Sequence, residues 1–201
     1  FRNQPLGCTS TIVYQMYQEK GAIIDKKTAG ILLAAIISDT LMFRSPTCTQ
    51  MDRAAAEALA KIAEVDIEEL AKKMFEAGSD FKKKTTEELF YQDFKTFHTD
   101  EFDFGVAQLS AMSDVQLGMA KKKLQPYLEI ALGEQKLDAV FVMLTDILDE
   151  NSEVIYAGAQ AGSLLKECFG EPDESGSFYL KGVVSRKKQM IPTLMAGLQQ
   201  A

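Results

Sequence analysis

Three adjacent cations near the C-terminus, Arg186, Lys187 and Lys188, form the most distinctive charged stretch of this sequence, SRKKQMIP. They stand in a chain whose formal net charge is -7, so they do not continue a generally basic composition. A guanidinium group offers a planar fork for two phosphate oxygens, and an ammonium group adds a point charge for a third. The stretch therefore predicts a site for a phosphate-like anion, and a solvated run of charges is the alternative interpretation.

A single carboxylate, Asp39, ends the apolar stretch AGILLAAIISD. An ionised carboxylate beside buried apolar groups loses hydration, and the end of a helix also disfavours negative charge. A bound metal ion or a catalytic role would explain its presence there. The alternatives are that Asp39 caps the following turn or forms an ion pair with Arg44.

Two further residues could carry chemistry in the middle of the chain. Lys95 lies in FYQDFKTF, where its aromatic neighbours suggest partial burial, although a surface lysine on an amphipathic segment is the simpler interpretation. His98 is the only histidine, and it lies in TFHTDEFDF, which is typical of a hairpin turn. We expect His98 to be a surface residue, since one histidine cannot form a histidine-rich metal site.

The predicted secondary structure divides the chain into two regions of different pattern. Residues 8 to 78 are predicted to be almost entirely helical, because apolar residues recur there with helical spacing. The segment AGILLAAII is apolar nearly all round, so we expect it to be buried. Candidate N-caps precede the four predicted helices: Thr9 or Ser10, Asp25, Thr49 and Asp66.

A charged segment without periodicity, SDFKKK at residues 79–84, is the best candidate for a linker and a hinge. Beyond it, strands alternate with helices, which indicates an α/β fold with a mixed sheet. Predicted strands are FDFGVAQLS, LDAVFVMLTDI, EVIYAG and SFYLKGVVS, and Pro126 is expected to interrupt a long helix. The cations of SRKK would then follow the last strand, where neighbouring side chains point to opposite faces.

Composition excludes several classes of protein. The chain has 201 residues, enough for one large or two small domains, and its three cysteines show no CxxC spacing that would indicate a zinc site. The acidic balance argues against nucleic acid as a partner, and no apolar run is long enough for a membrane helix. The sequence does not begin like a signal peptide, so a reducing, cytoplasmic setting is expected.

Four motifs in order resemble the family II inorganic pyrophosphatases, manganese-dependent enzymes of the Asp-His-His phosphoesterase superfamily. These motifs are PLGCTSTIV, AGILLAAIISDTLMFRSPTCT, LTDIL and KGVVSRKKQMIP. The resemblance implies two domains with an active site between them, hydrolysis of pyrophosphate to two phosphates, and a homodimer. It also implies Mn²⁺ or Co²⁺ as cofactor, with Mg²⁺ accompanying the substrate.

The resemblance assigns roles to individual residues. It makes Asp39 a metal ligand, Lys95 a substrate-binding residue, and Arg186 and Lys187 the pair that binds pyrophosphate. Lys188 would lie beside this pair without being a main contact. Arg186 and Lys188 are expected at a crevice and outside the core, so Arg186→Lys and Lys188→Ala should leave thermal stability nearly unchanged.

This sequence also departs from the family pattern. It contains neither the Asp-His-His motif nor an Asp-x-Asp motif, which supply most of the family's metal ligands. Residues 1–78 are therefore expected to be the C-terminal part of the catalytic domain, and 85–201 a complete C-terminal substrate-binding domain. We expect this chain to be inactive by itself.

Two alternative functions remain open. An exopolyphosphatase of the same superfamily would also bind a phosphate chain with cations, whereas the nuclease branch carries a Gly-Gly-Gly-His motif that is absent here. The chain could also bind phosphate or a partner without catalysis. The sequence does not say whether a regulatory nucleotide-binding module of the CBS type lies upstream in the parent protein.

Overall fold

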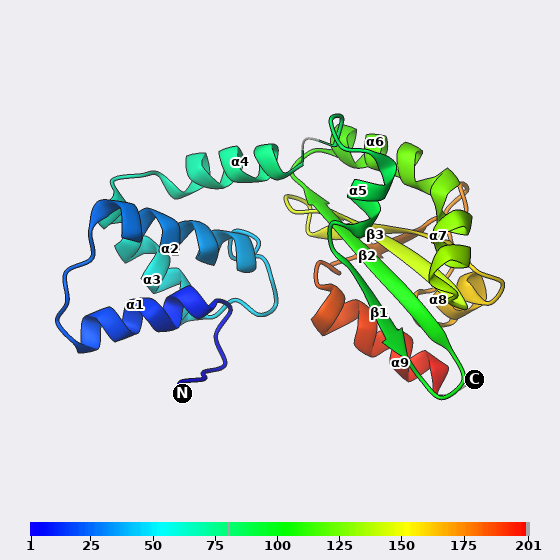
Figure 1. Cartoon of the computed structure of the whole chain (residues 1–201), viewed down its shortest axis with the longest axis horizontal. Helices are drawn as coiled ribbons and strands as arrows, with labels where there is room; N and C mark the ends of the chain where they lie inside the picture. Colours follow the sequence, from blue (N-terminus) through cyan, green and yellow to red (C-terminus); the bar gives the residue numbers. More distant parts are fainter. Residues whose placement is uncertain (80, 200–201) are drawn as a thin grey trace. The chain divides into compact units, whose positions relative to one another are not determined.

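The computed structural model describes residues 1–79 and 81–199, and it divides into two compact units, Phe1–Ala77 and Gly78–Ala201 (Figure 1). Each unit has its own hydrophobic core, so each is described by itself. Asp80, which belongs to the segment expected to be a linker, lies outside the described residues.

The first unit is helical, as its sequence predicted. Its helices are α1 (Thr9–Glu19), α2 (Lys26–Asp39), α3 (Gln50–Ala63) and α4 (Ile67–Gly78), which ends just past the boundary. Three of the four expected caps are confirmed, because Asp25, Thr49 and Asp66 each accept a backbone N–H of the following helix. The first expectation was wrong, because the N-cap of α1 is Cys8, whose Sγ accepts the N–H of Ser10 at 3.3 Å.

The core of the first unit lies along one side of α2. Small residues of α3 bring its backbone close to α2, and together they bury Leu33, Ile36 and Ile37 completely. The other side of the same helix is different, since Ile31 is 71% exposed. The expectation that this apolar segment is buried all round was therefore wrong.

The second unit is built on a five-stranded mixed sheet, which confirms the predicted α/β fold. The strands follow one another in the order β1-β2-β3-β4-β5. Strands β2 and β3 are parallel, and the other neighbours are antiparallel. Their bounds are Phe94–His98, Asp103–Ala111, Ala139–Asp146, Asn151–Ala157 and Phe178–Lys181.

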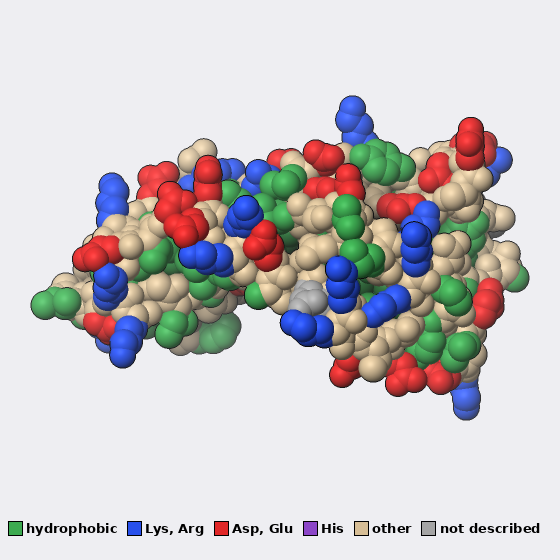
Figure 2. Space-filling model, turned by 90° about the horizontal axis from the view of Figure 1, so that it is seen from above, with side chains coloured by type: hydrophobic (Ala, Val, Ile, Leu, Met, Phe, Trp, Pro, Cys, Tyr) green, Lys and Arg blue, Asp and Glu red, His purple; other side chains and the backbone are tan. Residues whose placement is uncertain are grey.

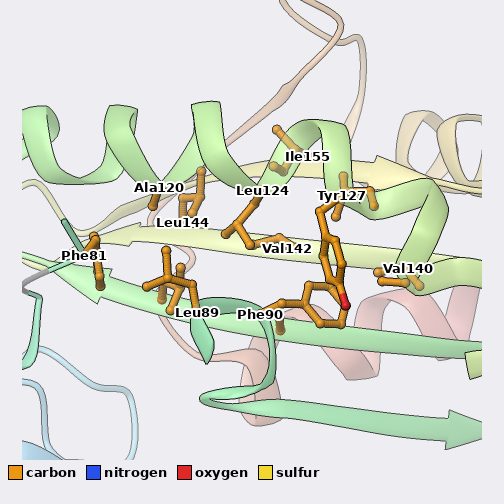
Figure 3. Close-up of a cluster of buried hydrophobic side chains, with 14 of the residues drawn as sticks. Phe81, Leu89, Phe90, Ala120, Leu124, Tyr127, Val140, Val142, Leu144 and Ile155 are labelled. Atoms are coloured by element: carbon orange, nitrogen blue, oxygen red, sulfur yellow. The ribbon is translucent and has the colours of Figure 1, made fainter. Parts of the chain in front are cut away.

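Helices cover both faces of this sheet. One face carries α5 (Thr86–Tyr91), α6 (Asp114–Leu124), the short helix η1 (Gln125–Tyr127) and α7 (Leu128–Gln135). Figure 3 shows Leu124 and Tyr127 above the sheet residues Val140, Val142 and Leu144. The other face carries α8 (Ala161–Phe169), η2 (Arg186–Met190) and α9 (Ile191–Leu198). Pro126 interrupts the long helix where the sequence predicted.

The residues that follow Asp80 pack against the second unit. Phe81 is only 2% exposed and belongs to the core of the first sheet face (Figure 3). The Lys123 ammonium group donates to the carbonyls of Phe81 at 2.9 Å, Lys82 at 3.2 Å and Lys84 at 2.9 Å. Residues 81–84 are thus a loop that is fastened to the second unit.

Two further features concern the length of the helices and the charges at the surface. Within the ranges 1–79 and 81–199, no helix is long and apolar enough to cross a membrane. Figure 2 shows acidic and basic side chains side by side over the face that it draws.

Candidate functional site

The stretch SRKKQ forms a helical turn and does not continue a strand. Strand β5 ends at Lys181, and Gly182, at a φ of +73°, turns the chain in a conformation that disfavours other residues. Arg186–Met190 then forms a π-helical turn, in which the Ser185 hydroxyl accepts the N–H of Lys188 at 3.2 Å. The strand predicted to run through GVVS is therefore too long. Because the cations lie on a helical turn, neighbouring side chains do not alternate between two faces as they would in a strand.

One side chain, Gln189, fixes the loop before these cations. Its Oε1 accepts the N–H groups of Val184 and Ser185, both at 3.0 Å, and its Nε2 donates to the carbonyl of Gly182 at 2.7 Å. These bonds satisfy three backbone groups that belong to neither a helix nor a strand. The Gln189 side chain therefore holds this loop in one conformation.

Hydrogen-bonded polar side chains of the sheet also hold the loop that Gln189 contacts. Gln108 Nε2 donates to the Val184 carbonyl at 3.1 Å and to Thr145 Oγ1 at 3.0 Å. Ser152 Oγ donates to the Val183 carbonyl at 2.6 Å and lies 2.9 Å from Thr145 Oγ1. Because the single hydroxyl proton of Ser152 is used on Val183, Thr145 donates to Ser152. Buried groups that are fully paired in this way tend to fix one conformation.

Arg186 is buried, contrary to the expectation that it lies outside the core. It is 7% exposed. Its Nη1 donates to the carbonyls of Asp93 at 2.5 Å and Val106 at 3.0 Å, and its Nη2 donates to Asp93 Oδ1 at 2.7 Å. These three bonds fasten the SRKKQ turn to the beginning of β1 and to the middle of β2.

The structure brings Lys95 close to this arginine. Lys95 pairs with Val106 across β1 and β2, and Asp93 lies two residues before Lys95. The two backbone carbonyls that Arg186 Nη1 contacts, those of Asp93 and Val106, are therefore both close to Lys95. Lys95, Lys187 and Lys188 are all exposed. The aromatic neighbours of Lys95 therefore do not bury it. Arg186 is thus a buried, oriented cation. The lysines that follow it in the chain, Lys187 and Lys188, and Lys95 on the strand paired with Val106 are exposed.

Asp39 is the last residue of α2 in the first unit, and it is exposed. The Cys8 side chain lies against its carboxylate, and burial first, then this neighbour, raises the pKa of the Cys8 thiol to about 11. The thiol is therefore protonated at neutral pH and adds no negative charge beside Asp39. In the described part of the chain, no three histidine, cysteine, aspartate or glutamate side chains are gathered to hold a metal ion.

An unusual turn follows Asp39, and sequence reasoning missed it. Leu41, Met42 and Phe43 have φ values of 48°, 51° and 69°, a left-handed conformation that is unfavourable for residues with a Cβ. Thr40 Oγ1 accepts the N–H of Phe43 at 3.2 Å, and Arg53 Nη2 donates to the Phe43 carbonyl at 2.7 Å. These bonds hold the strained turn in place.

A second residue that sequence reasoning missed is Asp52, a fully buried carboxylate. It accepts the N–H groups of Gly7, Cys8 and Thr49 at 2.9, 3.3 and 2.8 Å, and the hydroxyls of Thr11 and Thr49 at 2.5 and 2.7 Å. Burial alone would raise its pKa, but these bonds outweigh burial and lower it. The available signal was the Thr-x-x-Asp spacing of a capping box.

His98 lies at the surface, as predicted from its place in a hairpin. It is exposed, and its Nδ1 is 3.0 Å from the carboxylate of Asp103. The strand pairing of β1 with β2 confirms the hairpin. His98 is the last residue of strand β1, which also carries Lys95.

Residues 72–196 match the family model of the DHHA2 domain. The chain belongs to the DHHA2 domain family. Strands β1 to β5 and the SRKKQ turn all lie within the matched residues, whereas Asp39 precedes them. Arg186, Lys187 and Lys95 therefore all lie within the residues that match the DHHA2 domain.

Relatives of this DHHA2 chain extend the similarity over nearly all of it. The manganese-dependent inorganic pyrophosphatase of Bacillus subtilis is 41% identical over 194 residues, which are 96% of this chain and 62% of the relative. The enzyme of the same name from Methanothrix thermoacetophila is 38% identical, covering 100% of this chain and 65% of the relative. The chain thus spans somewhat less than two thirds of these relatives.

A solved structure agrees with these relatives. A Methanococcus jannaschii protein, described as belonging to the family II inorganic pyrophosphatases, has a TM-score of 0.83 and 32% identity. The similarity covers 98% of this chain and 66% of that one. These comparisons confirm the resemblance that the sequence motifs predicted.

Proposed function

We propose that this chain is the larger part of an enzyme that hydrolyses pyrophosphate to two phosphates with manganese. The observation that carries this proposal is its similarity, over nearly its whole length, to relatives named manganese-dependent inorganic pyrophosphatases. The cluster formed by Arg186, Lys187 and Lys95 supports the proposal, since pyrophosphate carries several negative charges that cations must neutralise.

In this proposal the cluster binds the substrate. Lys187 and Lys95 supply exposed ammonium groups that can reach phosphate oxygens. Arg186 supplies the guanidinium N–H groups that are not bonded to Asp93 or Val106. Its bonds to these two residues fix the orientation of the remaining N–H groups. Lys188 adds positive charge without being a main contact. Orientation and charge neutralisation are the main requirements of phosphoryl transfer to water.

Asp39 is proposed as a metal ligand. A carboxylate oxygen is a donor that suits Mn²⁺, and an octahedral ion needs roughly six donors, so Asp39 would supply only one of several. When bound, the metal ions would acidify a water molecule to serve as the nucleophile. Asp39 itself would contribute an oxygen donor and negative charge at the end of α2.

Several finer assignments belong to the same proposal. Residues 1–78 would be the C-terminal part of the catalytic domain, 79–84 a linker, and 85–201 the substrate-binding domain. Co²⁺ would substitute for Mn²⁺, Mg²⁺ would accompany the substrate, and the whole enzyme would be a cytoplasmic homodimer without nucleic-acid or membrane partners.

Phosphate release tests the proposal. The full-length protein is assayed with pyrophosphate and with polyphosphates of increasing length, in the presence of Mn²⁺, Co²⁺ or Mg²⁺ alone. We expect rapid release from pyrophosphate with Mn²⁺ or Co²⁺, and none from the 201-residue chain. A strong preference for long polyphosphate would favour the exopolyphosphatase alternative, and full activity of the 201-residue chain would contradict the role of the missing ligands.

A further inference from the structure

We propose that Asp93 is a positioning residue of the cation cluster: it holds the guanidinium group of Arg186 in one orientation for an anion bound beside Lys95 and Lys187. This inference rests on the proposed function of the cluster as a phosphate-binding site. It adds a residue that does not itself contact the anion and that carries the opposite charge.

Asp93 contacts the Arg186 guanidinium group through both its backbone and its side chain. Its carbonyl accepts Arg186 Nη1 at 2.5 Å and its carboxylate accepts Arg186 Nη2 at 2.7 Å, so one residue engages two nitrogens of the same guanidinium group. The same carbonyl also accepts the N–H of Gln108 at 3.1 Å, which fixes Asp93 to strand β2. Since the guanidinium group is planar, two contacts of this kind determine its plane.

The count of donors leaves room for a ligand. A guanidinium group has five N–H donors, and three of them are used on Asp93 and Val106. In the ranges 1–79 and 81–199, the Nε–H and the second Nη2–H have no hydrogen-bond acceptor. A phosphate group could therefore bind Arg186 without displacing Asp93. An arginine that is already fixed loses less side-chain freedom on binding than a free one.

Electrostatics alone predicts the opposite effect of Asp93. A carboxylate beside three cations weakens the attraction of the cluster for an anion, so its removal should strengthen binding. Positioning predicts that removal weakens binding, because Arg186 loses its orientation. The two explanations therefore differ in the sign of the effect.

The variants Asp93→Ala and Asp93→Asn separate charge from geometry. Both remove the negative charge, but asparagine keeps an oxygen that can accept a hydrogen bond from Nη2, and both keep the carbonyl. Asp100→Asn is the matched control, since it removes one exposed carboxylate from the β1–β2 hairpin. Side-chain NMR signals of the 201-residue chain are followed during titration with pyrophosphate in the presence of a metal chelator, and thermal unfolding is measured in parallel.

We expect Asp93→Ala to weaken pyrophosphate binding about tenfold, the effect of one charge-assisted hydrogen bond on an equilibrium constant. Asp93→Asn should lie between Asp93→Ala and the native chain, and Asp100→Asn should bind as the native chain does or slightly more tightly. In an Arg186→Lys background, Asp93→Ala should have little further effect, because no guanidinium group remains to be oriented.

Three results would overturn the inference. These are equal tightening in Asp93→Ala and Asp93→Asn, an undiminished effect of Asp93→Ala in the Arg186→Lys background, and a native chain that does not bind pyrophosphate at all. In the first two cases the proposed function survives if the full-length enzyme hydrolyses pyrophosphate. Failure of that hydrolysis would instead remove the proposed function.

Discussion

At the scale of residues, three cations that are adjacent in the sequence have different environments in the structure. Arg186 is 7% exposed and bonded to Asp93 and Val106, while Lys187 and Lys188 are exposed. A substitution at Arg186 therefore changes both stability and any substrate contact, whereas one at Lys187 leaves the buried contacts intact and affects only a substrate contact. This difference decides which residue is the cleaner probe of anion binding.

Arg186→Lys is expected to lower the free energy of unfolding by about 1–3 kcal/mol, because an ammonium group cannot reproduce the planar contacts and leaves buried carbonyls unpaired. Lys187→Ala should change it by less than about 0.5 kcal/mol, as exposed substitutions usually do. Urea unfolding followed by circular dichroism measures both in the 201-residue chain. In the full-length enzyme, each variant should reduce kcat/KM by about 30- to 1000-fold.

The control for this comparison is Lys188→Ala, which should affect neither stability nor rate strongly. Native stability in Arg186→Lys would mean that its three bonds contribute nothing to folding. A native rate in Lys187→Ala would instead remove Lys187 from the substrate contacts.

Asp52→Asn is expected to destabilise the chain by about 3 kcal/mol at pH 7. The side-chain amide nitrogen of asparagine would face N–H or O–H groups that now donate to the carboxylate, and a donor cannot accept a hydrogen bond from another donor. The pKa of Asp52 is lowered in the folded state, so its contribution is fully present above the unfolded pKa of about 3.9 and is lost as pH falls through the folded pKa. Urea unfolding at pH 7 and at lower pH measures the difference between native and variant chains.

The matched control is Asp25→Asn, because Asp25 is an exposed N-cap and asparagine caps helices about as well. It should leave stability nearly unchanged at pH 7. The pKa of Asp25 is lowered in the folded state by its hydrogen bonds to Thr28 and Lys27, so at lower pH the native chain loses part of this cap and the variant does not. An Asp52→Asn effect that stays constant below pH 4 would show that the charge of Asp52 is not what stabilises the fold.

At the scale of elements, capping was the part of the fold that local sequence predicted best. Asp25, Thr49 and Asp66 each cap a helix where expected, because a cap needs only a side chain and the N–H groups two or three residues later. The end of β5 was missed because Gly182 turns the chain and Gln189 stabilises the result through contacts that no local pattern encodes.

Lys123→Met is expected to open the loop of residues 81–84 to protease. The Lys123 ammonium group donates to three carbonyls of this loop, and methionine has a similar length without a donor. Trypsin cleavage after Lys82 or Lys84, followed by mass spectrometry, should be faster in the variant. The linker hypothesis predicts rapid cleavage here even in the native chain, whereas the fastened loop predicts slow cleavage.

Lys122→Met is the control, since Lys122 is exposed on the same helix and its replacement should leave the cleavage rate unchanged. Equal rates for the native chain and Lys123→Met would show that the buried ring of Phe81 alone holds the loop.

At the scale of the whole molecule, the α/β fold and the candidate residues could be predicted, but their arrangement could not. The resemblance of four motifs to the family II inorganic pyrophosphatases predicts Asp39, Lys95, Arg186 and Lys187 as site residues, whereas residue chemistry alone left other interpretations open. The contact of Arg186 with Asp93 joins residues that are 93 positions apart. It depends on strand pairing and on the SRKKQ turn, so no composition or spacing argument could have revealed it.

The two units have separate cores, and we expect them to respond separately to core substitutions. Leu59→Ala removes a buried side chain from the first unit and Phe141→Ala one from the second, each with a cost of about 3 kcal/mol or more. Hydrogen exchange with mass spectrometry should show faster exchange only in peptides of residues 1–77 for Leu59→Ala, and only in peptides of 81–199 for Phe141→Ala. This readout suits the chain because it contains no tryptophan to report unfolding by fluorescence. The exposed double variant Lys61→Ala and Lys166→Ala serves as the control, since it changes one surface residue in each unit and should leave both exchange patterns as they are in the native chain. If either core variant accelerated exchange throughout both units, the chain would unfold as one cooperative body, and the boundary between Ala77 and Gly78 would have no energetic meaning.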